Sequence, residues 1–136
     1  MRHSDSYQLH QSTQVLPTIL YSRKYLFLQK IKKIIDINMD NEEFCVATLA
    51  KKAHLSTSQL NRKLKSLNSE PAGQLIRIQR MNYAAQLLAN DVATIGEIAD
   101  RVGYPTHANF CRSFKRQFGC SPSQYSKKNM SGTTSA

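Results

Sequence analysis

The chain carries one helix-turn-helix pattern twice, and this duplication restricts the fold more than any other feature of the sequence. The clearer copy runs from Thr94 to Phe118, where apolar residues three and four apart define two short helices separated by a turn at Gly103. Leu49 and Ala50 match the residues 49 places later. Past the turn six positions match at a shift of 50, namely Leu60, Arg62, Leu64, Lys65, Gln74 and Leu75 against Phe110, Arg112, Phe114, Lys115, Gln124 and Tyr125. The sequence therefore predicts two units of the same kind.

Helical periodicity also covers the segments around these units. From Tyr25 to about Met39 the apolar residues recur on one face, and a last short helix is predicted from Ser121 to about Lys128, after Gly119. Residues 71–90 read as one long helix with Pro71 in its first turn. The predicted fold is all-α, with helix-turn-helix subdomains at about 46–67 and 94–118 joined by the central helix at about 71–90.

The two ends of the chain lack this periodicity. Residues 1–24 are polar, so we expect a flexible tail or an interdomain linker ahead of a folded domain at 25–128. The alternative is an arm that packs on the domain or on a second chain through Val15, Leu16, Ile19 and Leu20. Residues 129–136 are expected to be a disordered tail.

The charge of the chain indicates a polyanionic partner. The formal net charge is +10, which favours nucleic acid, with a membrane surface as the weaker alternative. No acidic residue follows Asp100. The outward faces of the second helix in each unit hold Ser58, Asn61, Arg62 and Lys65 in the first and Ala108, Cys111, Arg112 and Lys115 in the second. Arginine can grip guanine through two hydrogen bonds, whereas lysine more often holds a phosphate.

Other kinds of site find little support in the sequence. There is no glycine-rich phosphate loop, G-x-S-x-G or H-E-x-x-H motif, so an enzyme is not expected. His107, Cys111 and Cys120 form only a loose trio of zinc ligands, and we expect neither a metal nor a cofactor. Phenylalanines spaced by four on one helix can stack on single-stranded bases, but they are interpreted as core: Phe110, Phe114 and Phe118.

Cysteine usage and the absence of targeting signals suggest where the chain acts. The three cysteines are odd in number and include no C-x-x-C pair, as in a reducing compartment. There is no signal-peptide pattern and no run of 18 apolar residues. We therefore expect a cytoplasmic protein without a membrane partner.

The second unit closely resembles one family of bacterial regulators. The residues that carry the resemblance are Arg80-Met81 through Leu87-Leu88, Ile95-x-x-Ile98-Ala99-x-x-Val102-Gly103-Tyr104 and Phe110-x-x-x-Phe114-Lys115-x-x-Phe118-Gly119-x-Ser121-Pro122-x-x-Tyr125. Over residues 25–128 the chain resembles the C-terminal DNA-binding domain of AraC/XylS transcription regulators. The resemblance implies about seven helices in two lobes and a function in sequence-specific binding of double-stranded DNA, with two helices in successive major-groove segments.

The resemblance also implies which side chains meet DNA. The base-reading positions are Ser58, Asn61, Arg62, His107, Ala108, Cys111 and Arg112, and the phosphate-binding positions are Thr57, Lys65, Thr106, Lys115 and Arg116. The chain departs from the family pattern at Ala108-Asn109, where the family usually has an aromatic residue next to the Phe110 site, and at His54, where glycine is common. These departures leave the preferred DNA sequence undetermined.

Partners beyond DNA follow from the resemblance as well. Most relatives carry an effector-binding, dimerisation or sensor domain ahead of this module, and RNA polymerase is a further partner to be considered. The segment from Leu55 to Leu64 is most similar to modules attached to sensor proteins, which favours a fragment of a larger regulator over a standalone member. The alternative function is a protein-interaction module built on helix-turn-helix units without DNA readout.

Overall fold

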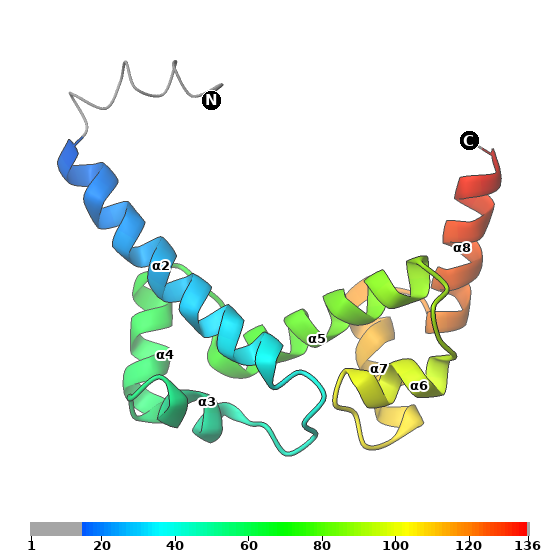
Figure 1. Ribbon diagram of the computed structural model, residues 1–136, viewed down its shortest axis with the longest axis horizontal. Coiled ribbons are helices and arrows are strands. Elements are labelled where there is room, and N and C mark those ends of the chain that lie inside the picture. Colours follow the sequence, from blue (N-terminus) through cyan, green and yellow to red (C-terminus); the bar gives the residue numbers. More distant parts are fainter. Residues whose placement is uncertain (1–14, 136) are drawn as a thin grey trace.

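Seven helices and no strands make up the part of the chain that the structure describes. The structure is a computed structural model that describes the backbone of residues 15–135 and the side chains of residues 23–128. The helices are α2 (Val15–Ile37), α3 (Val46–Lys52), α4 (Thr57–Ser66), α5 (Ala72–Ala89), α6 (Ile95–Arg101), α7 (His107–Phe118) and α8 (Pro122–Ser135). Helix α5 crosses the molecule, with α2, α3 and α4 around its start and α6, α7 and α8 around its end (Figure 1). The all-α prediction, with two subdomains on a central helix, is confirmed.

Each half of α5 contributes to a separate hydrophobic core. Ala72, Leu75 and Ile76 are buried with residues of α2, α3 and α4, which together form the first lobe. Met81 and the apolar residues after it are buried with α6 and α7, which together with α8 form the second lobe. Phe110 and Phe114 are fully buried there, and Phe118 packs against the same core, which confirms their interpretation as core residues. The central helix is therefore the structural link between two small cores.

The two units turn in the same way with different residues. Gly103, which follows α6, has φ +80°, as expected for the residue that ends this helix. His54 occupies the equivalent position after α3 and has φ 62°. A side chain in the left-handed region costs about 1–2 kcal/mol relative to the right-handed one. The two lobes therefore make the same turn, but the backbone is strained at His54 in the first lobe and unstrained at Gly103 in the second.

Both terminal helices are longer than the sequence predicted. Helix α2 begins at Val15, about ten residues before the predicted start at Tyr25, so residues 15–24 are not an irregular tail. Pro17 lies in the first turn of α2, where its missing N–H has no intrahelical partner to lose, and it therefore does not prevent this start. Helix α8 extends to Ser135 instead of ending near Lys128. The side chains of the expected arm, Val15, Leu16, Ile19 and Leu20, and the prediction for residues 1–14 lie outside the described part.

Candidate nucleic-acid interface

Helices α4 and α7 run in the same direction at opposite ends of the molecule. Both start at the lower edge of Figure 1 and run upward. Each turns leucine or phenylalanine side chains into its own core, with Leu60 and Leu64 buried in α4 and Phe110 and Phe114 in α7. Their opposite faces remain open to solvent. The duplicated sequence pattern therefore produces two similar helices with equivalent free faces.

Side-chain caps fix the start of both helices. Ser56 accepts a hydrogen bond from the Gln59 backbone N–H at 3.1 Å, and the Gln59 side chain accepts one from Ser56 N at 2.9 Å. Thr106 caps α7 by accepting a hydrogen bond from Asn109 N at 3.2 Å. Such caps satisfy a backbone N–H that has no partner within the helix, and each typically contributes about 1 kcal/mol. The first turns of both helices are therefore well defined.

Most of the predicted DNA-contacting side chains lie on the surface. Ten of the twelve are exposed and available to a partner, namely Thr57, Ser58, Arg62, Lys65, Thr106, His107, Ala108, Arg112, Lys115 and Arg116. Asn61 and Cys111 are half-buried. Neither helix contains an acidic residue. The two faces therefore present positive charge and hydrogen-bonding groups without internal neutralisation.

Asn61 has a structural partner that the sequence did not reveal. Its Oδ1 accepts a hydrogen bond from the backbone N–H of Ala72, the first residue of α5, at 2.9 Å. Pro71, the N-cap residue of α5, provides no side-chain cap. Asn61 thus caps the central helix from α4. Because the two-bond contact of asparagine with adenine uses both its oxygen and its nitrogen, this cap removes one of the two groups needed.

Arg112 and His107 have neighbours on α7 itself. The Arg112 guanidinium donates to Asn109 Oδ1, three residues earlier. His107 Nδ1 and Cys111 Sγ lie 3.6 Å apart. Among the residues with described side chains, no group of three or more His, Cys, Asp or Glu is placed to hold a metal ion, so Cys120 does not complete a site with this pair.

The far end of α7 is tied to the central helix. Arg77 of α5 donates from Nη1 to Gln117 Oε1 at 2.9 Å and from Nε to Gln74 Oε1 at 2.9 Å. Arg77 and Gln117 are 40 residues apart in the chain, so sequence periodicity alone could not pair them. The bond helps to hold α7 at a fixed inclination to α5.

Comparison with known proteins defines the class of this domain. The family model described as a helix-turn-helix domain matches residues 49–128, from the middle of α3 through the central helix and the whole second unit. Within the described residues no helix is long and apolar enough to cross a membrane. Fold and free faces together define a helix-turn-helix domain of the DNA-binding type.

The relatives show which branch of this class the chain represents. It is 32% identical over 101 residues to "Histidine kinase P4" of Formosa agariphila, which covers 74% of the chain and 7% of the relative. It is 24% identical to the "RCS-specific HTH-type transcriptional activator RclR" of Escherichia coli, over 89% of the chain and 41% of the relative. It is 31% identical to the "HTH-type transcriptional regulator MtrA" of Neisseria gonorrhoeae, over 72% of the chain and 32% of the relative. The chain thus spans less than half the length of each of these relatives.

Solved structures agree with this placement. The C-terminal domain of AraT, a response regulator from Geobacillus stearothermophilus, has a TM-score of 0.69 and 30% identity, covering 74% of this chain and 83% of that one. The C-terminal domain of the two-component response regulator yesN from Fusobacterium nucleatum has a TM-score of 0.67 and 28% identity, covering 72% of this chain and 95% of that one. The chain belongs to the AraC/XylS family of DNA-binding transcription regulators. This family is a DNA-binding type and not an enzymatic one.

Proposed function

We propose that the domain regulates transcription by placing α4 and α7 in two successive major-groove segments on one side of the duplex. The observation that carries this proposal is the pair of equivalent, acid-free faces on two helices that run in the same direction. The major groove of DNA admits an α-helix, and successive groove segments on one side are about 34 Å apart. A role on DNA also places the domain in the bacterial cytoplasm. No catalytic activity is part of the proposal.

The side chains divide into two groups by what they contact. Base edges are read by Ser58 and Arg62 from α4 and by His107, Ala108, Cys111 and Arg112 from α7, where the contact with Asn109 orients the Arg112 guanidinium. Phosphates are held by Thr57, Lys65, Thr106, Lys115 and Arg116. The oxygen of Asn61 already accepts a hydrogen bond from α5, which fixes the orientation of its amide. We therefore assign Asn61 a positioning role first and a base contact second.

The assignment of Arg62 and Arg112 is tested by substitution. Replacement of either arginine with alanine should weaken binding of the preferred site by about 1–3 kcal/mol and relax base preference at one half-site only. Lys65→Ala is the control, because loss of a phosphate contact should weaken all sequences alike. The measurement is selection from randomised duplexes followed by titration at fixed salt. An unchanged site preference in both arginine variants would show that α4 and α7 do not read bases.

A module that binds only proteins is the competing function. Binding of phosphates releases counterions, so affinity for duplex DNA should fall linearly with salt on a double-logarithmic scale. A module that binds only proteins has no affinity for DNA that could vary with salt in this way. Measurement of DNA affinity over a series of salt concentrations therefore separates the two functions, and no detectable DNA binding at low salt would contradict the proposal.

The larger protein in which this module acts is proposed from the coverage of the relatives. The chain matches only part of each relative, and two of the similar structures are C-terminal domains of response regulators. We therefore propose that an N-terminal sensor or dimerisation domain controls this module and that RNA polymerase is its partner at promoters. A test is whether the genomic reading frame continues upstream of Met1.

A further inference from the structure

The junction between the two lobes lies at Arg80, in the middle of α5. The apolar residues before it, up to Ile76, belong to the core of the first lobe, and those from Met81 onward belong to the core of the second. Among the residues with described side chains, Arg80 is the only buried polar or charged residue, with 8% of its surface exposed. Charged residues are rarely buried without a specific partner. This position therefore requires an explanation.

Arg80 contacts both lobes at once. Its Nη2 donates a hydrogen bond to the backbone oxygen of Asn41, in the loop between α2 and α3, at 2.8 Å. On the other side lies Gly103, in the turn between α6 and α7. A methyl group added at Gly103 would come within 2.9 Å of Arg80 Nη2 and 2.7 Å of the Met39 backbone oxygen. The missing side chain at Gly103 thus allows the turn of the second lobe to lie directly against the loop of the first.

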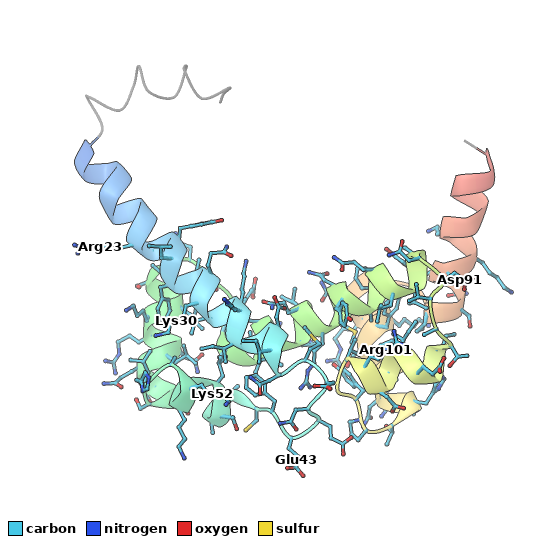
Figure 2. All side chains as sticks on the ribbon, viewed as in Figure 1. Arg23, Lys30, Glu43, Lys52, Asp91 and Arg101 are labelled. Atoms are coloured by element: carbon cyan, nitrogen blue, oxygen red, sulfur yellow. The ribbon has the colours of Figure 1, made fainter. Side chains whose placement is uncertain are left out.

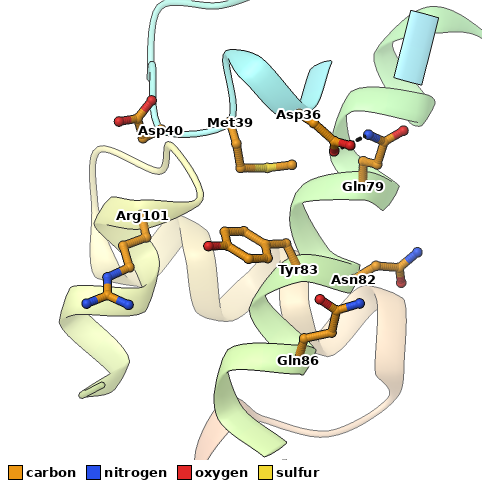
Figure 3. Close-up of a pocket in the computed structure, with 8 residues that line it drawn as sticks. All are labelled: Asp36, Met39, Asp40, Gln79, Asn82, Tyr83, Gln86 and Arg101. Atoms are coloured by element: carbon orange, nitrogen blue, oxygen red, sulfur yellow. Dashed lines mark hydrogen bonds between the residues drawn. The ribbon is translucent and has the colours of Figure 1, made fainter. Parts of the chain in front are cut away.

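Apart from α5 itself and the Arg77–Gln117 hydrogen bond, little else holds the lobes together. Within the described residues, no helix of one lobe makes more than a marginal contact with a helix of the other, except through α5. Between the lobes lies a cavity of about 550 Å³, with Asp36, Met39 and Asp40 on one side and Arg101 on another (Figure 3). Residues of α5 complete its lining, namely Gln79, Asn82, Tyr83 and Gln86. The contact at Arg80 is therefore well placed to determine the angle between the lobes.

The charge at this position is costly for stability alone. Burial lowers the pKa of the Arg80 guanidinium, because a charged group loses hydration, and Nε has no hydrogen-bond partner. An apolar side chain of similar length would fill the same space without that cost, as replacement of buried charges in other proteins shows. What an apolar side chain cannot do is fix the loop carbonyl of Asn41 in one direction.

We propose that Arg80 is a positioning residue that sets the angle between the lobes, and thereby the separation of α4 and α7 on DNA. The inference rests on the proposed function, in which both helices bind the same duplex. The link to specificity is geometric. Helices held at one separation reject DNA whose half-sites are displaced, whereas lobes that rotate about the middle of α5 accept several spacings. Arg80 therefore selects half-site spacing without touching DNA.

The test compares Arg80→Met with the wild-type domain on a series of duplexes. The preferred wild-type site is altered by insertion or removal of 1 or 2 bp between the half-sites, and each half-site is also measured alone. The wild-type domain should lose affinity by about tenfold, the equivalent of one good base contact, when the spacing changes by 2 bp. Arg80→Met should bind each single half-site with wild-type affinity. When the spacing changes by 2 bp, its affinity should fall by at most about threefold, or roughly 0.7 kcal/mol.

A matched control and a second variant make the outcomes distinct. Arg101→Met removes an exposed arginine from the cavity wall and should keep the wild-type spacing profile. If the wild type itself shows no spacing dependence, the two-helix function is wrong. If the affinities of the wild type and of Arg80→Met depend equally on half-site spacing, the positioning role of Arg80 is wrong. Arg80→Lys is tested in parallel, and unfolding of a lobe in both variants would contradict the proposal by making Arg80 a requirement for folding.

Discussion

At the scale of single residues, two glycines with the same backbone conformation have different surroundings. Gly103 and Gly119 both have φ +80°, a conformation that strains any residue with a side chain. A methyl group at Gly119 would meet no atom within 4 Å, whereas at Gly103 it would meet the Met39 oxygen and the Arg80 guanidinium. Gly119 is thus needed only for its backbone angle, and Gly103 for its angle and for the close approach of the lobes.

This difference predicts unequal effects of the same substitution. Gly119→Ala should lower the free energy of unfolding by about 1 kcal/mol, the cost of a left-handed alanine. Gly103→Ala should cost that amount plus roughly 1–3 kcal/mol for crowding in a packed junction. Urea denaturation followed by circular dichroism measures both variants under one condition. Equal destabilisation by the two substitutions would mean that the lobes do not approach each other closely at Gly103.

At the scale of helices, the helix that follows each copy of the repeat begins in a different way: α5 after the first copy and α8 after the second. Ala72 at the start of α5 has a backbone N–H, and Asn61 accepts its hydrogen bond. Fifty residues later the equivalent positions are Cys111 and Pro122, and Pro122, the first residue of α8, has no N–H to donate. The second copy therefore needs no polar acceptor at position 111.

Substitutions of Asn61 separate its two assigned roles. Asn61→Ala should destabilise the first lobe by about 1 kcal/mol, because the Ala72 N–H loses its acceptor. Asn61→Asp retains an acceptor and should keep the stability, while its negative charge weakens binding to DNA. Thermal unfolding and DNA titration of both variants test this. Wild-type stability of Asn61→Ala would show that the cap is unimportant.

The start of α6 should respond to acid. Glu97 and Thr94 form a reciprocal cap in which the Glu97 side chain accepts from Thr94 N at 2.8 Å. Hydrogen bonds from the Thr94 backbone and side chain lower the pKa of Glu97. A lowered folded-state pKa means that this stabilisation is complete above the ordinary glutamate pKa of about 4.3 and is lost as the pH falls through the lowered value.

Comparison of the wild type with Glu97→Gln tests whether the Glu97 carboxylate causes this pH dependence of stability. Glu97→Gln keeps the acceptor but removes the titration, so the loss of stability on acidification should be smaller in this variant than in the wild type. The measurement is the free energy of unfolding in urea at neutral pH and at a pH below the ordinary glutamate pKa. The same pH dependence in both proteins would show that Glu97 does not contribute to it.

The helices could be predicted from local sequence signals, whereas contacts between distant residues could not. The turn at Gly103 and the two short helices on either side of it follow from residue preferences over a few positions, and the sequence predicted both. The cap from Asn61 to Ala72 and the contact of Arg80 with the loop and with Gly103 depend on how helices pack. The sequence therefore predicts Asn61 only as a base-reading residue, on an outward position beside Arg62.

At the scale of the whole molecule, the two free faces are separated by one continuous helix. Helix α5 has 18 residues, which span about 27 Å at a rise of about 1.5 Å per residue. Basic residues such as Arg23, Lys30 and Lys52 surround the first lobe, while Glu43 lies in the loop that reaches the junction (Figure 2). This length is of the same order as one groove repeat of about 34 Å.

The central claim is that both lobes bind one face of the same duplex at the same time. Insertion of about 5 bp between the half-sites rotates one of them by half a turn and moves it to the far side of the DNA. We expect affinity for this duplex to fall to that for a single half-site, in a titration of the domain at fixed salt. Equal affinity for the native and the half-turn spacing would contradict the account and leave one helix to read the DNA.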